Sequence, residues 1–130
     1  MIVSAGPTKY TPKRDKYSRS RGASQFLNLF CAKDGAHLVL YQKDGPGALR
    51  RLYLDRIFAP SPQSDWQALS NLAEVPNLTC PNCGSLIGSP MIYRSENRLA
   101  IRLNAGTFSK VRSDGTFNPL ETTTETTTES

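Results

Sequence analysis

The sequence predicts a mainly β fold: a small antiparallel sheet and one short helix, with a charged, disordered tail at each end. Nine Gly and nine Pro among 130 residues interrupt the chain too often for long helices, which excludes a coiled coil or a helical bundle. The apolar residues occur in short runs between turn sequences, as in β proteins. With this length and 38% hydrophobic residues, we expect one domain with a single core.

Residues 1–22 form a basic arm that we expect to be disordered on its own. Residues 1–23 carry six basic side chains against one acidic residue, Asp15, which gives a net charge of +5. The arm has few aliphatic residues, so it buries too little apolar surface to offset the entropy of ordering it. Basic residues interleaved with Tyr10 and Tyr17 are typical of arms that contact phosphates and stack on bases. The candidate nucleic-acid contacts of the arm are Lys9, Lys13, Arg14, Lys16, Arg19 and Arg21.

The two tails have opposite charge. Residues 121–130 repeat the pattern Glu-Thr-Thr-Thr without an apolar residue, which predicts a disordered acidic tail over residues 120–130. For the basic arm, a solubilising tail and an organelle transit segment are the alternatives to nucleic-acid binding.

Residues 23–119 are expected to form the folded domain. Apolar runs predict strands at 26–30 and 37–42, and the turn sequence Asp-Gly-Pro-Gly at 44–47 predicts a hairpin into a third strand at 49–58. Basic and apolar residues partly alternate along this third strand, which predicts one solvated face. Further candidate nucleic-acid contacts are Arg50 and Arg51, and the same basic face would include Arg56, Arg98 and Arg102.

One helix and several short strands complete the domain. Ser64 and Gln67 have the Ser-x-x-Gln spacing of a capping box, and apolar residues follow at helical intervals, which predicts a helix at about 64–73. Short strands are expected at 78–80, 91–93, 99–103 and 108–112, with turn sequences between them.

The three cysteines carry the most specific signal in the chain. Their odd number argues against a disulfide framework. The segment 80–84, Cys-Pro-Asn-Cys-Gly, has the form of a zinc knuckle, a tight turn in which two thiolates converge on one ion. The segment 31–35, Cys-Ala-Lys-Asp-Gly, has the same spacing, with an aspartate at the position of the second cysteine. The sequence therefore predicts a degenerate pair of knuckles.

Four protein ligands are normal for structural zinc, and the paired turns supply Cys31, Asp34, Cys80 and Cys83. A carboxylate oxygen binds zinc at a bond length similar to that of nitrogen, and three thiolates with one carboxylate have the same formal charge as four thiolates. His37 is the competing fourth ligand, and Asp34 is favoured because it repeats the position of Cys83. In a further alternative, Cys31 is an ordinary buried strand residue and the site is weak or empty.

A redox role for Cys80 and Cys83 is disfavoured by the residues that follow them. Disulfide oxidoreductases place the first cysteine at the start of a helix, which lowers its pKa. Here two glycines and a proline follow within residues 84–90, and they cannot form that helix.

The two turns, Cys-x-x-Asp-Gly and Cys-x-x-Cys-Gly, give the chain a resemblance to the zinc-ribbon class of folds. The long segment between them, residues 35–79, resembles the larger β-tent relatives, such as Yippee-like and methionine-sulfoxide-reductase B proteins. The resemblance covers roughly residues 31–112 and implies a zinc-ribbon-like β domain that binds Zn²⁺. It does not imply reductase activity, because no cysteine follows Cys83 to act as the nucleophile.

The residues favour binding over catalysis. The chain has one His and no Gly-rich phosphate loop before a helix, and a zinc ion with four protein ligands has no open position to activate water. We expect a non-enzymatic zinc-binding module that binds RNA or a ribonucleoprotein, without a small-molecule substrate. The alternative is a zinc-stabilised protein–protein interaction module with solubilising tails. No apolar run reaches the ~20 residues needed to cross a bilayer and no secretory signal is evident, so a soluble cytoplasmic protein is expected.

Overall fold

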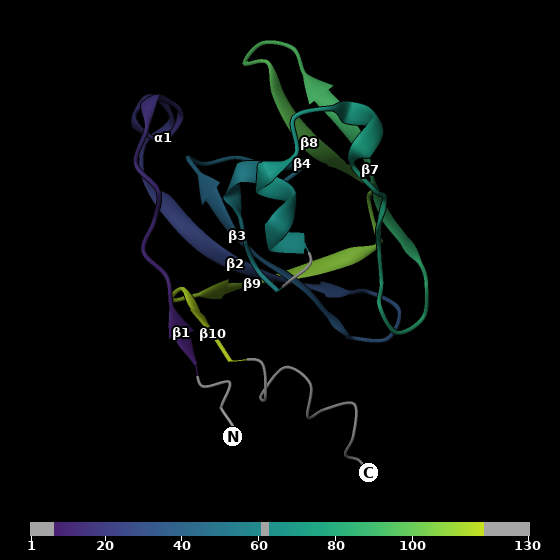
Figure 1. Cartoon of the computed structure of the whole chain (residues 1–130). Coiled ribbons are helices and arrows are strands. Elements are labelled where there is room, and N and C mark those ends of the chain that lie inside the picture. Colours follow the sequence, from purple (N-terminus) through teal and green to yellow (C-terminus); the bar gives the residue numbers. More distant parts are fainter. Residues whose placement is uncertain (1–6, 61–62, 119–130) are drawn as a thin grey trace, which may run out of the picture.

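The computed structural model describes residues 7–60 and 63–118, and their fold is mainly β, as predicted from the sequence (Figure 1). Two four-stranded antiparallel sheets carry the fold, together with a two-stranded pair. The first sheet has the order β5-β3-β2-β9, with strands Ile57–Ala59, His37–Asp44, Ser24–Cys31 and Phe108–Ser113. The second has the order β4-β8-β7-β6, with strands Arg51–Tyr53, Arg98–Leu103, Leu86–Tyr93 and Leu78–Thr79.

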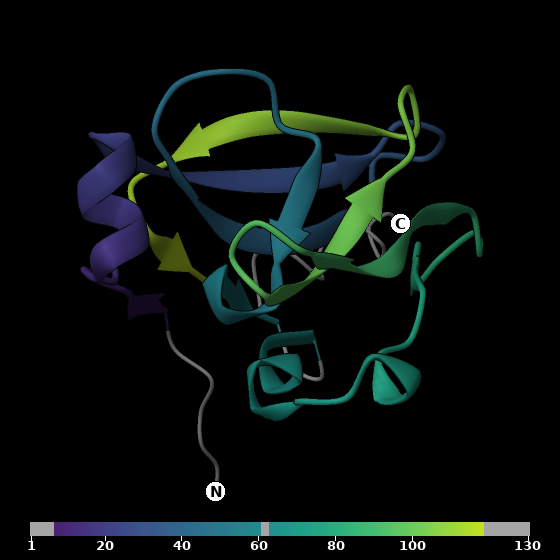
Figure 2. The ribbon, with the colours of Figure 1, turned by 90° about the horizontal axis from the view of Figure 1, so that it is seen from above.

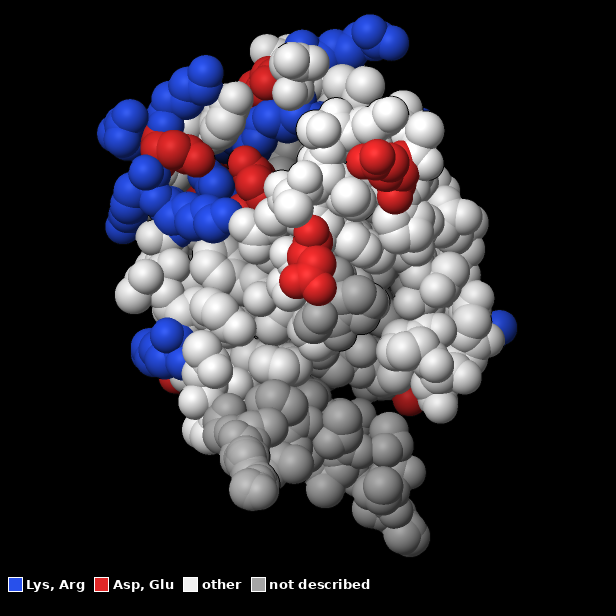
Figure 3. Space-filling view, viewed as in Figure 1, with Lys and Arg blue, Asp and Glu red and all other residues white. Residues whose placement is uncertain are grey.

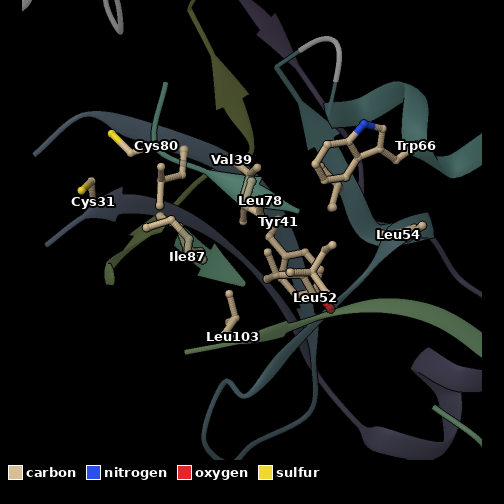
Figure 4. Close-up of a cluster of buried hydrophobic side chains, with 14 of the residues drawn as sticks. Cys31, Val39, Tyr41, Leu52, Leu54, Trp66, Leu78, Cys80, Ile87 and Leu103 are labelled. Carbon is tan, nitrogen blue, oxygen red and sulfur yellow. The ribbon is translucent and has the colours of Figure 1, made fainter. Parts of the chain in front are cut away.

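The main core is built from both four-stranded sheets. On β2, Leu27, Leu29 and Cys31 alternate with residues of the other face and join this core, which β7 and β8 also reach through Ile87 and Ile101. Figure 4 shows part of this core, with Cys31 and Cys80 together at one end and Trp66 at the other. Burying this apolar surface is the main force that holds the two sheets together.

A β-bulge gives β3 a nearly continuous buried run. The register between β2 and β3 shifts at Leu29/Phe30, so that Phe30 pairs with His37 while Leu29 pairs with Val39. Leu38 is the extra residue, and both it and Val39 are buried in the main core. The opposite face of this sheet has a smaller core of its own, formed by Phe26, Leu40, Ala59 and Phe117, with Tyr10 and Phe58 packed against it.

The predicted hairpin at 44–47 and the single strand at 49–58 were wrong. β3 and β4 lie in different sheets, and the segment between them loops out to make the crossing (Figure 2). The predicted third strand is broken by a 3₁₀ turn, η1 (Leu54–Arg56), after which β5 pairs with β3. This break places Arg56 in the interior, where it is 1% exposed, instead of on a solvated strand face.

The predicted helix at 64–73 is two 3₁₀ segments, η2 (Gln63–Ala68) and η3 (Leu72–Glu74). Gln67 does not complete a capping box, because its side-chain amide donates to the carbonyl of Ile57. Asn71 has an extended backbone and caps η3 through the amide of Ala73, so that η3 is a separate segment from η2.

The prediction of a disordered arm was wrong for residues 7–22. Strand β1 (Thr8–Lys9) pairs with β10 (Thr116–Phe117), and the helix α1 (Lys16–Arg21) follows. Asp15 begins α1 with a capping box, accepting from the amides of Tyr17 and Ser18. Residues 1–6 of the arm and the acidic tail at 120–130 lie outside the described residues, so that the prediction of disorder there stays a prediction.

Buried charges explain why this segment folds against the domain. Arg56 donates to Asp15 at 2.7 Å and to Asp44 at 2.9 Å, which links the start of α1 to the first sheet. The Lys13 amide and carbonyl bond to the side chain of Gln42, which is fully buried. These polar contacts replace the aliphatic residues that the segment lacks, and composition alone does not reveal them.

Candidate metal centre

The two predicted knuckles adopt matching backbone turns. In the first, the amide of Cys31 donates to the carbonyl of Ala36 at 2.8 Å, and the amide of Gly35 donates to the carbonyl of Cys31 at 2.8 Å. In the second, the amide of Cys80 donates to the carbonyl of Ser85 at 2.9 Å, and the amide of Gly84 donates to the carbonyl of Cys80 at 3.0 Å. Both glycines have a backbone φ of +78°, which residues other than glycine rarely adopt.

Each knuckle belongs to a different sheet. The first turn joins β2 to β3 in one sheet, and the second joins β6 to β7 in the other. The turns meet at one end of the core, where the sulfurs of Cys31 and Cys80 lie (Figure 4). The side chains of Cys31, Asp34, Cys80 and Cys83 form one cluster, whose ligand atoms all lie within 4.8 Å of one another.

Two of the residue pairs in the cluster have separations that match those of a tetrahedral zinc site. With Zn–S bonds of about 2.3 Å and Zn–O bonds of about 2.0–2.2 Å, two sulfur ligands lie about 3.8 Å apart, and a sulfur and an oxygen about 3.5 Å apart. The Sγ atoms of Cys31 and Cys83 are 3.8 Å apart, and Cys80 Sγ lies 3.5 Å from both carboxylate oxygens of Asp34. The four side chains can therefore surround one metal ion.

Hydrogen bonds around the cluster favour the anionic form of two ligands. The backbone amide of Ala36 and the side-chain amide of Asn82, which donates to Asp34 at 2.8 Å, hold the pKa of the Asp34 carboxyl well below its usual range. The side-chain hydroxyl and the backbone amide of Ser85 lower the pKa of Cys83. These are the charge states that metal binding requires.

Cys80 is the most enclosed thiol of the second knuckle. Burial raises the pKa of Cys80, while the amides of Asn82 and Cys83, each 3.4 Å from its sulfur, oppose that effect. Amides directed at a cysteine sulfur stabilise the thiolate, so the turn is arranged to support a metal-bound sulfur.

His37 lies outside this cluster. Its Nε2 is 2.8 Å from Oδ1 of Asn28, and its ring packs between Phe30 and Phe117. Burial lowers the pKa of His37 to about 4, so that the ring is neutral at physiological pH. Of the two candidates for the fourth ligand, Asp34 is the one that the structure places beside the cysteines.

Sequence reasoning did not identify Asn82 and Ser85 as parts of the site. Asn82 joins the two turns through Asp34, and the hydroxyl of Ser85 lies 3.1 Å from the sulfur of Cys83. Their positions within and directly after the second knuckle are the only signal that could have found them.

The segment after the second knuckle is a strand. β7 begins at Leu86, and no helix starts at Cys80 or Cys83 among the described residues. The helix dipole that activates the first cysteine in disulfide oxidoreductases is therefore missing here, as the sequence predicted.

The predicted nucleic-acid contacts of the arm differ in their surroundings. In the arm, Lys13 donates to the carbonyl of Asp55 and Arg21 pairs with Glu96, whereas four other basic residues point to solvent. These exposed residues are Lys9, Arg14, Lys16 and Arg19. Figure 3 shows the Lys and Arg side chains gathered around the α1 corner of the molecule with acidic groups between them.

The predicted basic sheet face was also wrong in part. Arg56 and Arg98 are buried at 1% and 7% exposure, and both are paired with carboxylates. Arg98 lies between the rings of Tyr17 and Tyr53, at 4.0 and 3.9 Å from their centroids, and so helps to hold α1. Arg50 and Arg102 are exposed, and Arg51 is half-buried.

The comparisons with known proteins give no identification. No family model, no curated protein and no solved structure matches this chain. Among the described residues, none of the helices has both the length and the apolar character that crossing a bilayer requires.

Proposed function

We propose that the chain is a zinc-binding module in which one Zn²⁺ ion, bound by Cys31, Asp34, Cys80 and Cys83, fastens the two sheets together. The observation that carries this proposal is the convergence of two matching knuckles from different sheets, with ligand separations suited to a tetrahedral ion. Knuckles of the zinc-ribbon type are the closest general description of such a centre.

A structural role follows from the ligand set. Four protein ligands complete the coordination of zinc and leave no position for a substrate or a reactive water, so we propose a non-enzymatic protein. The ligands come from turns separated by residues 35–79, so the ion would close a long loop and stabilise the contact between the sheets.

Metal analysis of the purified full-length chain tests this proposal. We expect one equivalent of zinc, and we expect Co²⁺ in its place to give the visible absorption of a tetrahedral ion bound by sulfur. Cys83→Ser should weaken metal binding, whereas Lys33→Ala, which changes an exposed residue of the first turn, should retain it. A chain that binds neither metal, with reduced thiols, contradicts the proposal, and one equivalent of iron would assign the site to another metal.

We also propose RNA or a ribonucleoprotein as the partner of this module. The support is the net charge of +5 and the exposed basic residues, which attract a phosphate backbone at long range. Retention of labelled RNA by the full chain at low salt, with release as the salt concentration rises, tests this second proposal. A chain that fails to bind RNA at low salt contradicts it and favours a protein partner.

A further inference from the structure

Six of the ten arginines form two groups with different surroundings. Arg21, Arg56 and Arg98 are each paired with a carboxylate inside the folded domain. Arg50, Arg51 and Arg102 have no ion pair with any described residue, although two of them are directly opposed across neighbouring strands. The second group is therefore left with an uncompensated positive charge.

Arg51 of β4 and Arg102 of β8 are partners in the antiparallel register. Like charges that face each other across two strands destabilise a sheet, and a cross-strand acid would relieve the repulsion. The sequence instead places Arg50 beside this pair. An anionic ligand bound at this position would remove the repulsion that the sheet itself does not compensate.

A groove of about 680 Å³ lies at these three arginines. Its apolar wall includes Leu49, Met91 and Phe108. These residues belong to the segment before β4, to strand β7 and to the start of β9, respectively. This volume is within the range of sites that bind organic ligands, and cationic side chains beside an apolar wall suit a ligand that is both anionic and partly apolar.

A second hollow of about 210 Å³ adjoins the groove and shares Ala48, Leu49, Arg50 and Arg51 with it. Tyr53 and Tyr93 line this second hollow, and the guanidinium of Arg51 lies 4.2 Å from the ring centroid of Tyr93. The hollow also contains Arg21, whose Nη1 is buried without a hydrogen-bond partner among the described residues. Cationic and aromatic side chains thus line these two adjoining hollows, which we together call the track.

We infer that this track, the Arg50–Arg51–Arg102 groove with its extension at Tyr93, binds single-stranded nucleic acid. The phosphates lie on the arginines, and bases stack on the ring of Tyr93 and against the apolar wall at Phe108. The inference rests on the proposed nucleic-acid binding and moves its centre from the basic arm to the second sheet.

The aromatic and apolar lining favours a nucleic acid over an acidic peptide. An acidic peptide needs cations alone, whereas every base has a flat apolar face that gains from an adjacent ring. Planar guanidinium groups bind phosphate oxygens in pairs and also stack, which suits a flexible strand with alternating phosphates and bases.

The test uses the full chain, labelled oligouridine, oligothymidine of equal length and a polyglutamate peptide. We expect the double variant R50S/R102S to bind oligouridine about tenfold more weakly at about 50 mM salt, with a salt slope reduced by about 1.4 if each arginine contacts one phosphate. The comparison variant R14S/R19S removes the same charge from exposed positions in and before α1, where long-range attraction to phosphate is lost but no groove contact, and should weaken binding by only about threefold.

A second variant separates stacking from charge. Tyr93→Leu removes the aromatic ring and keeps an apolar side chain, so affinity should fall about fivefold or more while the salt slope stays the same. Melting temperature and metal content, measured on each variant, report whether the fold is retained.

Each result decides the inference. Equal losses of affinity in R50S/R102S and R14S/R19S, or a loss in R14S/R19S alone, contradict the groove as the binding site. Nucleic-acid binding by the chain would still stand. Wild-type protein that binds neither oligonucleotide overturns both. Polyglutamate bound as tightly as oligouridine, and lost in R50S/R102S, assigns the groove to an acidic protein segment. Comparison of oligouridine with oligothymidine distinguishes RNA from DNA.

Discussion

The Sγ atoms of Cys31 and Cys83 lie 3.8 Å apart, although the two cysteines belong to turns of different sheets. This separation is that of two sulfurs bound to one tetrahedral ion and is far longer than a disulfide bond of about 2.05 Å. At this end, the two sheets therefore bring together four side chains that could hold a metal ion.

Metal removal should unfold the domain. Structural zinc in small domains contributes about 10 kcal/mol or more, which is comparable with the whole stability of a domain of this size. We expect Cys80→Ser, or wild-type protein with a chelator, to lose the cooperative thermal transition measured by circular dichroism. Asn82→Ala keeps all four ligands and should lower the melting temperature by only a few degrees. Full thermal stability of the metal-free chain would contradict a structural role.

Substitutions of Asp34 and His37 should show which of the two residues is the fourth metal ligand. Asp34→Cys completes four thiolates and should retain or tighten zinc, whereas Asp34→Ala should weaken it. His37→Ala should reduce stability by about 1–2 kcal/mol through lost packing and an unpaired Asn28, with zinc content unchanged. Zinc content measured on all three variants decides the ligand, and its loss in His37→Ala alone would make His37 the ligand.

The metal cluster was the part of the site that sequence could predict. Its knuckles are local turns, and the Cys-x-x-Asp-Gly and Cys-x-x-Cys-Gly spacings fix their geometry whatever the rest of the chain does. The basic face was not predictable in the same way, because the break at η1 turns Arg56 inward, where it pairs with Asp44 and with Asp15, 41 residues away in the sequence. Composition gives the number of charges, and only the tertiary structure shows which of them are neutralised.

The free energy of unfolding should fall as the pH is lowered, because protonation of Asp15 breaks its ion pair with Arg56. The side-chain hydrogen bond from Arg56 lowers the pKa of Asp15 to about 2 from its ordinary 3.8. The folded protein therefore binds this proton less readily than the unfolded chain, so the stabilisation is complete above about pH 5 and is lost as the pH falls through 4 toward 2.

Comparison of wild type with Asp15→Asn measures this contribution, because both proteins carry the same metal centre. We expect the free energy of unfolding of wild type to exceed that of the variant by about 1 kcal/mol at pH 6, a figure reduced for the solvent exposure of Asp15, and the difference to shrink as the pH falls toward 4, while the metal is still bound. Glu74→Gln removes an exposed carboxyl on η3 and serves as the control. A difference that is independent of pH would contradict this role for Asp15.

Deletion of residues 1–22 should destabilise the domain, because it removes Asp15 from the buried Arg56 and Lys13 from the buried Gln42. The expected loss is about 3 kcal/mol, the cost of leaving buried charged and polar groups with fewer partners. Denaturant unfolding of the deleted and full chains measures it. The variant R14S/R19S keeps the segment with less charge and should unfold like wild type. An unchanged midpoint after deletion would show that the segment is dispensable for the fold.

A pair of glycines tests whether α1 is docked as described. A Cβ at Gly45 would lie 2.6 Å from the carbonyl oxygen of Arg21, whereas a Cβ at Gly47 would meet nothing within 4 Å. Both residues have positive φ, so alanine strains the backbone at either position. Gly45→Ala should therefore cost about 1–3 kcal/mol more than Gly47→Ala in denaturant unfolding. Equal costs would mean that α1 does not rest on this turn.

The β content was predictable from short apolar runs and turn sequences, and the arm was not. The helix α1 contains one fully buried residue, Ser18, so that no apolar stripe marks it as part of the domain. Its position depends on Tyr17 against Arg98 and on Asp15 against Arg56, which are pairs between residues far apart in sequence. Such pairs leave no periodic signal.

The pairing of β1 with β10 sets Thr8 opposite Phe117 and Lys9 opposite Thr116, so that the chain's path through the domain closes nearly into a ring (Figure 1). The chain could therefore begin and end at another surface turn without loss of this pairing. Joining the paired ends by a short linker and cutting at the turn between β7 and β8, where Arg94 and Ser95 are exposed, would give a circular permutant with the same strand pairings. The same closure would let the whole domain be inserted into a surface loop of a host protein at little cost in loop-closure entropy.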